Sequence, residues 1–495
     1  MKTGFDSALY MERQTEQILR RIELFRGKLY LEFGGKLFDD YHAARVLPGF
    51  DVNAKAKLLE QLKDRAEIIM CINSRDIEKK RIRGDYGITY DLDAMRLIDN
   101  LRHMGLTVSA IVLTQYDEQP AATAFCKKMR ILGESVCIHR ATKGYPTDVA
   151  TIVSPEGYGA NPYIETSRPL VVVTAPGAYS GKLATCLSQV YHERVRGVMA
   201  GYAKFETFPI WNLPLKHPVN LAYEAATADL DDVNMIDPFH LEAYSVTTVN
   251  YNRDIEVFPV VKAILSKITG GDVYKSPTDM GVNMAGKCIT DDAAVREAAK
   301  QEIIRRYYRC GAECKQGRMD AGALNKIEII MSQLEIKPED RQVVAPALRK
   351  EAERGVPAVS VRLPDGTIVT GKAGDLMSAP SGAVLNAIKE LSGISDNIRL
   401  IAPAVIEPII RLKQNALGQN ANNLALNLDE ILIALSISAV TNPMAELAVE
   451  ALEELRGCEA HSTCILPEAD ESVMRKLQIN LTSEPVFPIK DLYYR

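Results

Sequence analysis

The chain has 495 residues, which is too long for a single hydrophobic core, so we expect two or three domains. Its apolar content of 47% and charged content of 25% are typical of soluble globular proteins. The formal net charge of −5 gives no reason to expect nucleic acid or an anionic membrane as a partner.

Targeting and cysteine patterns predict a cytoplasmic protein. No apolar run approaches the length of a transmembrane helix, and the first residues lack the apolar core of a signal peptide. The nine cysteines are odd in number and thinly spread, so we do not expect a disulfide framework.

The first candidate site is a polar segment that follows the first predicted strand. Apolar residues at helical spacing predict a surface helix over residues 7–26, and residues 28–33 predict a strand. Residues 34–50 predict a loop, and loops at the carboxyl ends of parallel strands are where open α/β sheets bind ligands. The candidate catalytic residues are Lys36, Asp39, Asp40 and His42, and Arg45 is a candidate substrate contact. The alternative is a polar connection with solvated charges.

Strands and helices alternate in the next segment, which indicates βαβ units with a parallel sheet. Strands are predicted over residues 66–72, 107–113 and 136–139, and helices over 91–104, capped by an aspartate, and 121–132. Residues 79–85 form a basic segment after the first of these strands. Arg81 and Arg83 are candidate contacts for a phosphorylated ligand, and a solvated charged face is the alternative.

The stretch over residues 168–185 has the pattern of a phosphate-binding loop. Residues 170–173 are continuously apolar and β-branched, which predicts a strand buried on both faces. A turn of small residues follows, and a helix is predicted over residues 183–198. Free N–H groups and the positive end of the helix dipole would converge on one spot there, where a lysine adds a mobile charge. The candidate nucleotide- or phosphate-binding residues are Gly177, Ser180, Gly181, Lys182 and Thr185.

This loop departs from the P-loop pattern G-x-x-x-x-G-K-[ST]. Its spacing is Gly177-x-x-x-Gly181-Lys182. Leu183 stands where the hydroxyl that holds Mg²⁺ should be, and Thr185 and Ser180 are the nearest substitutes. The alternative interpretation is a tight strand-to-helix turn with a surface lysine.

A nucleotide at this loop would need a carboxylate for its Mg²⁺ at the end of a neighbouring strand. Three aspartates follow apolar stretches: Asp76, Asp117 and Asp237. Asp39 and Asp40 are the other candidate pair, with His42 or Lys36 as proton-transfer or charge-stabilising partners.

The middle third is more helical, with helices predicted over residues 219–228, 254–269, 291–310 and 321–333. Residues 274–286 are dense in turn formers and hydroxyls. Short polar side chains between glycines suit a ligand loop, and an ordinary helix-to-helix connection is the alternative. The candidate substrate contacts in this segment are Ser276, Thr278, Asp279 and Asn283.

A second α/β unit is predicted from about residue 336. Residues 358–371 predict a hairpin with a Pro-Asp-Gly turn. Further helices are predicted over residues 381–391, around Ile409, and over 431–438 and 444–455. Strands are predicted over 398–401 and 461–466, and the last strand is followed by residues 468–477 and a Pro-rich tail. We therefore predict an α/β phosphate-binding domain (1–215), a mainly helical segment packing on it (216–335) and a C-terminal α/β domain (336–495).

Several common catalytic and metal-binding patterns are missing. The sequence has no H-E-x-x-H, no G-x-S-x-G, and no G-x-G-x-x-G after a strand. Cys310 and Cys314 place two thiols on one helical face, but no second Cys or His pair lies at zinc-finger spacing. His461 and Cys464 are interpreted as packed side chains of a buried strand. No metal site is therefore assigned.

Three segments together resemble one bacterial family: residues 32–40, 174–182 and 276–284. It is an uncharacterised family of proteins of about this size, in which an N-terminal domain of unknown function precedes a distinct C-terminal one. The resemblance covers essentially the whole chain, and it implies the α/β fold and a bacterial cytoplasmic protein. Some members carry the label of an ATP-dependent peptidase, but this sequence holds no peptidase residues that support it.

The sequence thus predicts an α/β protein with a three-layer, mainly parallel N-terminal sheet and a smaller C-terminal α/β domain. The leading hypothesis is an enzyme that binds a nucleotide such as ATP with Mg²⁺, or another phosphorylated small molecule, for phosphoryl transfer or ATP-driven ligation. The alternatives are an enzyme on a phosphorylated metabolite without nucleotide, and a non-catalytic metabolite-binding or oligomeric assembly protein. We expect a small phosphorylated ligand, no nucleic-acid or membrane partner, and a homo-oligomer.

Overall fold

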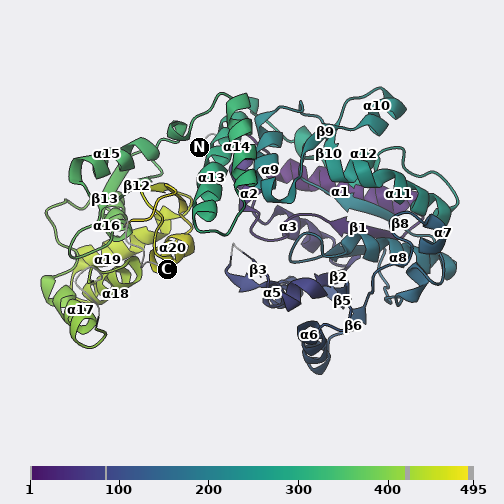
Figure 1. Cartoon of the computed structure of the whole chain (residues 1–495), viewed down its shortest axis with the longest axis horizontal. Coiled ribbons are helices and arrows are strands. Elements are labelled where there is room, and N and C mark those ends of the chain that lie inside the picture. The colour runs from purple at the N-terminus through teal and green to yellow at the C-terminus, as the bar shows by residue number, and fades with distance from the viewer. Residues whose placement is uncertain (1–2, 84–85, 419–423, 489–495) are drawn as a thin grey trace. The chain divides into compact units, whose positions relative to one another are not determined.

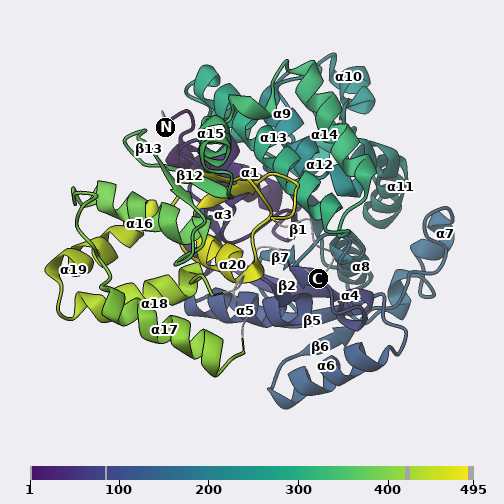
Figure 2. The same ribbon diagram turned by 60° about the vertical axis from the view of Figure 1, so that its left-hand side comes forward.

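The computed structural model describes residues 3–83, 86–418 and 424–488. The chain divides into two compact units, residues 1–299 (the N-terminal unit) and residues 300–495 (the C-terminal unit). The long helix α13 (Asp292–Lys315) runs across the boundary between them. Figures 1 and 2 show the elements of both units from two directions.

The N-terminal unit is built on a seven-stranded sheet in which every neighbouring pair of strands is parallel. The order across the sheet is β11-β8-β1-β7-β2-β5-β6. The strands are β1 (Leu29–Phe33), β2 (Ala66–Asn73), β5 (Thr107–Thr114), β6 (Val136–Ile138), β7 (Leu170–Thr174), β8 (Gly201–Phe205) and β11 (Gly281–Val282). The predicted mainly parallel α/β sheet is therefore confirmed.

Strand β7 lies at the centre of this sheet, between β1 and β2. All five of its residues are buried, because their apolar side chains face packed layers on both sides of the sheet. The continuous apolar run in the sequence predicted this position.

Helix α8 (Lys182–Val195) covers one face of the sheet. The hydroxyl of Tyr30 in β1 donates a hydrogen bond to the carboxylate of Glu193 in α8 at 2.8 Å. Helix α11 (Asn252–Thr269) packs beside α8. Helix α1 (Ser7–Leu24) reaches the edge strand, where the amide of Gln14 donates to the carbonyl of Val282 at 2.6 Å. The other helices before α13 are α2 (Tyr41–Val46), α3 (Ala54–Gln61), α4 (Ser74–Glu78), α5 (Tyr90–His103), α6 (Pro120–Ile131), α7 (Val149–Ile152), α9 (Pro218–Ala226), α10 (Pro238–Tyr244) and α12 (Pro277–Met280).

One short helix replaces part of the loop predicted over residues 34–50, and another lies in the connection over residues 147–166. In residues 34–50, helix α2 begins after Asp40, whose side chain accepts a hydrogen bond from the backbone N–H of Ala43 at 3.2 Å. In residues 147–166, α7 follows Asp148, which caps it through the backbone N–H of Thr151 at 3.1 Å. Helices this short show no apolar periodicity, so their capping residues are the only sequence feature that indicates them.

One further prediction for this unit is wrong in detail, and another is incomplete. The helix expected over residues 91–104 is α5, which follows Thr89 without a side-chain cap, so no aspartate caps it. The middle segment, predicted as mainly helical, also forms the hairpin of β9 (Asn234–Ile236) and β10 (Val249–Tyr251) and supplies β11 to the main sheet. Strands β9, β10 and β11 have only two or three residues each and show no alternating pattern in the sequence.

The C-terminal unit contains a mixed four-stranded sheet with the order β13-β12-β14-β15. Strands β12 (Ala358–Arg362) and β13 (Ile368–Lys372) form the predicted hairpin, and β14 (Glu459–Ser462) pairs with β15 (Asn480–Ser483) in parallel. Its helices after α13 are α14 (Ala321–Gln333), α15 (Val344–Arg354), α16 (Ala379–Leu391), α17 (Pro403–Asn415), α18 (Leu428–Ala439), α19 (Pro443–Glu450) and α20 (Glu468–Lys476). The smaller α/β unit expected from the sequence is therefore confirmed.

The strand predicted over residues 398–401 is wrong. Leu400 and Ile401 are buried in the apolar core of this unit, in the turn that leads to α17. Their apolar side chains are explained by that packing rather than by strand pairing. The last predicted strand, over residues 461–466, forms as β14, which begins and ends earlier in the sequence.

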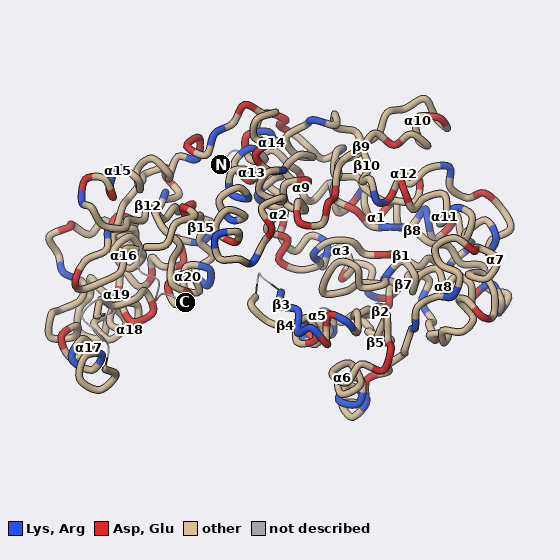
Figure 3. The backbone as a smooth tube through the Cα atoms, in the orientation of Figure 1, with Lys and Arg blue, Asp and Glu red and all other residues tan. Residues whose placement is uncertain are grey.

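Charged residues of both signs are intermixed along both units (Figure 3). This distribution agrees with the small formal charge of the chain. Of the helices in the described residues, none combines the length and the apolar character needed to cross a membrane.

Candidate functional site

The candidate site lies at the edge of the sheet where the parallel strands end. Strand β7 follows β1 and β2 in the chain but lies between them in the sheet. The connections that leave β1, β2 and β7 therefore emerge side by side at this edge. Ligands of open α/β sheets bind at such a reversal of strand order, outside the carboxyl ends of the strands.

Hydrogen bonds from the ends of strands β2 and β5 hold the loop that follows β7. The hydroxyl of Thr114, at the end of β5, donates a hydrogen bond to the carbonyl of Ser180 at 2.7 Å. The amide of Asn73, at the end of β2, donates to the carbonyl of Tyr179 at 3.1 Å. Gly181 has a φ of 80° and occupies the N-cap of α8. The loop conformation is therefore fixed by neighbouring strands as well as by its own glycine.

Replacing Gly181 with alanine is expected to destabilise the N-terminal unit by about 2 kcal/mol. The positive φ at this position is unfavourable for a residue with a side chain. A Cβ atom there would also lie 2.8 Å from the Cβ of Thr114. Gly197 is the matched control, since its φ is +79° but a Cβ there meets nothing within 4 Å. Gly197→Ala should cost about 1 kcal/mol in urea unfolding. Equal losses for the two variants would show that contact with Thr114 does not confine the loop.

Groups that can bind an anion remain available at the start of α8. In the described part of the chain, the backbone N–H groups of residues 181–184 have no protein acceptor, as is usual for the first turn of a helix. The ammonium of Lys182 lies 3.3 Å from the hydroxyl of Ser180, and no described carboxylate lies within ion-pair distance of it. These donors and the helix dipole favour an anion such as phosphate.

The other two candidate loop residues face the protein. Thr185 is fully buried, and its hydroxyl accepts a hydrogen bond from the thiol of Cys71 at 3.5 Å, on the sheet side of α8. Gly177 lies against the ring of Tyr90, which would be 2.5 Å from a Cβ at this position. Thr185 is thus directed toward the core, and Gly177 allows an aromatic ring to cover the loop.

A cluster of charged side chains lies on the same edge, and the sequence reasoning missed it. Its members, which we call the Lys204 cluster, are Glu32, Lys204, Glu206 and Asp254. The ammonium of Lys204 is 2.7 Å from the carboxylate of Glu206 and also pairs with Asp254. Glu32 is the register partner of Lys204 in the neighbouring strand β1. Three carboxyl groups therefore surround one lysine.

Burial changes the acidity of this cluster. Glu206 is 5% exposed. Its burial, reinforced by the negative charge of Asp254 and opposed by Lys204, raises the pKa of Glu206 to about 7. The three nearby carboxylates outweigh the desolvation of Lys204 and raise the pKa of its ammonium. A carboxyl group that titrates near neutral pH can both accept and donate a proton, as general acid–base catalysis requires.

The Lys204 cluster is connected to the loop through the first turn of α11. The guanidinium of Arg253 lies 4.9 Å from the ring centre of Tyr179 in the loop and is paired with Asp232 at 2.5 Å. The next residue, Asp254, pairs with Lys204. The anion-binding loop is therefore linked to the titrating carboxyl group through Arg253, Asp254 and Lys204. A sequence signal existed, since Glu32 and Lys204 are charged residues inside otherwise apolar strands.

The candidates after β1 are engaged with neighbouring residues. Burial alone would raise the pKa of Asp40, but its ion pair with Lys55 at 2.8 Å lowers it below the usual range. Asp39 accepts a hydrogen bond from the hydroxyl of Tyr86. The ring of His42 packs edge-on against Phe208, with 5.4 Å between ring centres. Lys36 and Arg45 are half-buried and also have partners in the protein.

The basic segment after β2 supports its own fold. Arg83 pairs with the buried carboxylate of Asp93, which also binds Arg96 at 2.9 Å. Arg81 is more exposed and lies 3.4 Å from Asp76. Of the two predicted ligand contacts, Arg81 is therefore the one with an exposed guanidinium.

The four candidates in residues 274–286 are bound to the surrounding backbone and side chains. Ser276 caps α12 through the backbone N–H of Asp279 at 3.1 Å. Thr278 donates to the carboxylate of Asp237 at 2.7 Å. Asn283 donates to the carbonyls of residues 207 and 209, at 3.2 and 2.9 Å. This segment is therefore hydrogen-bonded to the connection that follows β8.

The aspartates considered for Mg²⁺ do not meet at the loop. Asp237 is fully buried and caps α10 through the backbone N–H of His240 at 3.0 Å, while Asp117 is exposed after β5. Asp76 lies in α4, the short helix directly after β2, where it pairs with Arg81. Within the described residues, no group of three or more His, Cys, Asp or Glu side chains is arranged to hold a metal ion.

Comparison with known proteins agrees with the resemblance seen in the sequence. Residues 3–335 match the domain of unknown function DUF1846, N-terminal, and residues 339–493 match its C-terminal counterpart. UPF0371 proteins of Clostridium botulinum (strain Alaska E43 / Type E3) and Clostridioides difficile (strain 630) are 56% and 55% identical over 503 residues, covering both chains completely. A UPF0371 protein of Fusobacterium nucleatum is 54% identical over 507 residues, again with complete coverage. The chain therefore belongs to the DUF1846 family of uncharacterised bacterial proteins.

Proposed function

We propose that the chain is an enzyme that binds the phosphate group of a small molecule at the loop after β7 and transfers protons with the Lys204 cluster. The observation that carries this proposal is the meeting of two features at one sheet edge. One is a helix N-terminus with available N–H groups and the ammonium of Lys182. The other is the carboxyl group of Glu206, whose pKa is raised to about 7.

The geometry favours a single phosphate group over a Mg²⁺-bound triphosphate. The residue after Lys182 is Leu183, which offers no hydroxyl to a metal ion. The hydroxyl of Thr185 is engaged with Cys71 in the core. We therefore infer that the substrate is a phosphorylated metabolite, with its phosphate at Lys182 and its reacting part near Glu206.

Nucleotide binding is the second candidate function. It is favoured by the order of a central parallel strand, a loop with a left-handed glycine and a lysine at the first position of a helix. In that case Lys182 would stabilise phosphate charge during phosphoryl transfer or ligation, and Asp76 would be a candidate carboxylate for Mg²⁺.

Thermal unfolding with added ligands separates these proposals. Wild type and Lys182→Ala would be heated with inorganic phosphate, a sugar phosphate, ADP or ATP, each with and without Mg²⁺. A ligand at one hundred times its Kd stabilises the native state by about 2.7 kcal/mol, which raises the midpoint. We expect a rise with phosphate compounds, independent of Mg²⁺, that Lys182→Ala abolishes. Lys216→Ala, at an exposed lysine of the same unit, should respond like wild type.

A rise only with ATP and Mg²⁺ would replace the metabolite proposal with the nucleotide proposal. No rise with any of these ligands would leave the loop a structural turn. An equal rise in wild type and Lys182→Ala would place the phosphate elsewhere on the protein.

A further inference from the structure

Three sulfur atoms gather at the C-terminal end of α13, within the C-terminal unit. Cys310 and Cys314 lie one helical turn apart, and their Sγ atoms are 4.0 Å from each other. The chain then turns, and Met319 brings its Sδ to 3.1 Å from the Sγ of Cys310. Two thiols and one thioether from ten consecutive residues therefore point into the same small volume.

We propose that Cys310, Cys314 and Met319 form a binding site for a soft monovalent cation, Cu(I). Thiolate and thioether sulfurs are the donors that select Cu(I), whereas zinc sites in proteins use thiolate, imidazole and carboxylate and Mg²⁺ and Ca²⁺ sites use oxygen. Two ligands spaced by four residues on a helix can hold one metal ion on a single face, as in the H-E-x-x-H arrangement. The third ligand comes from the turn that follows.

The donors set the charge change on binding. The three sulfurs lie near the C-terminal end of a 24-residue helix. Binding would release one proton from each thiol as two Cu–S bonds form, and Met319 would add a lone pair from its thioether. The oxidation state of copper and of sulfur does not change in this step, so no further reactant is required.

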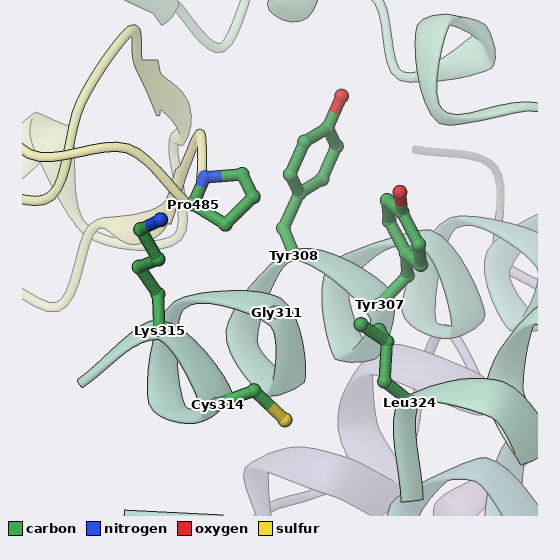
Figure 4. Close-up of a pocket in the computed structure, with 7 residues that line it drawn as sticks. All are labelled: Tyr307, Tyr308, Gly311, Cys314, Lys315, Leu324 and Pro485. Carbon is green, nitrogen blue, oxygen red and sulfur yellow. The ribbon is translucent and has the colours of Figure 1, made fainter. Parts of the chain in front are cut away.

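The proposed site has access to solvent through a cavity of about 360 Å³. Figure 4 shows Cys314 on the wall of this cavity, with Tyr308 and Lys315 from the same helix and Leu324 from α14. Cys310 is buried and Cys314 is half-buried. An ion arriving through the cavity would therefore meet Cys314 first.

Competition for Cu(I) under anaerobic, reducing conditions tests this proposal. The full-length protein would be titrated with Cu(I) in the presence of the chelator bathocuproine disulfonate. We expect wild type to retain one equivalent, and Cys314→Ser to bind at least about tenfold more weakly. Met319→Leu keeps the side-chain volume and removes the thioether, so it should bind more weakly than wild type. X-ray absorption should then count three sulfur neighbours around copper in wild type and two in Met319→Leu.

Matched variants control for the other thiols and methionines. Cys137→Ser removes a half-buried thiol of the N-terminal unit, and Met444→Leu removes a thioether of α19. Both should bind Cu(I) like wild type. The proposal is overturned if Cys314→Ser and Met319→Leu bind as tightly as wild type, if wild type retains no Cu(I) against the chelator, or if Zn²⁺ displaces Cu(I). Thermal unfolding of each variant without metal would confirm that the fold is intact.

Discussion

Replacing Arg341 with alanine is expected to destabilise the C-terminal unit by about 3–5 kcal/mol. Its guanidinium is 1% exposed and pairs with Glu459. It also donates to the carbonyl of Asn480 at 2.8 Å and to the hydroxyl of Thr482 at 3.0 Å. Arg341 thus joins strands β14 and β15. Its removal leaves several backbone and hydroxyl acceptors without their donor, and it leaves Arg305, at 3.2 Å, as the remaining cation beside the half-buried carboxylate of Glu459.

Urea unfolding followed by circular dichroism would measure this loss. Arg349→Ala, at an exposed position of α15, is the matched control and should change stability by less than about 0.5 kcal/mol. Adding Glu459→Gln to Arg341→Met should recover part of the lost stability, because it removes a carboxylate that has lost one of its two cationic partners. A loss near that of Arg349→Ala would show that the Arg341 contacts contribute little to the stability of the unit.

The pH dependence of stability is expected to change strongly in Glu206→Gln. The folded pKa of about 7 exceeds the ordinary value of 4.5, so the native state binds more protons than the unfolded state between these values. Glu206 therefore contributes stability that is complete below about pH 4.5 and is lost as the pH rises through 7. The loss is at most about 3 kcal/mol, since each pKa unit corresponds to about 1.4 kcal/mol. Glutamine does not titrate, so the variant lacks this pH-dependent contribution to stability.

Unfolding midpoints from pH 5 to pH 8 would measure the effect. Wild type should lose more stability than Glu206→Gln over this range, and the difference isolates Glu206 because all histidines are common to both proteins. Glu256→Gln, at an exposed position of α11, should follow wild type. Parallel profiles for wild type and Glu206→Gln would mean that Glu206 titrates in its ordinary range and would remove the acid–base part of the proposed function.

Much of the architecture could be predicted because it depends on local pattern. The apolar run of residues 170–173 predicted the central strand, and the small residues after it predicted the start of α8. Pro364, Asp365 and Gly366 specified the hairpin between β12 and β13. Strands β11 and β15 could not be predicted in this way, because tertiary pairing rather than composition makes them strands.

The same distinction between local pattern and tertiary structure applies to the candidate site. The sequence by itself determined the strand, the turn of small residues and the position of Lys182 at the start of a helix, since each depends on neighbouring residues. Only the tertiary structure decided that Thr185 faces the core and that Arg83 pairs with Asp93. It also assembled the Lys204 cluster from residues up to 222 positions apart, between Glu32 and Asp254. Parallel strands bring distant segments to one edge, and burial there sets the charge and acidity of a group that the sequence identifies only by residue type.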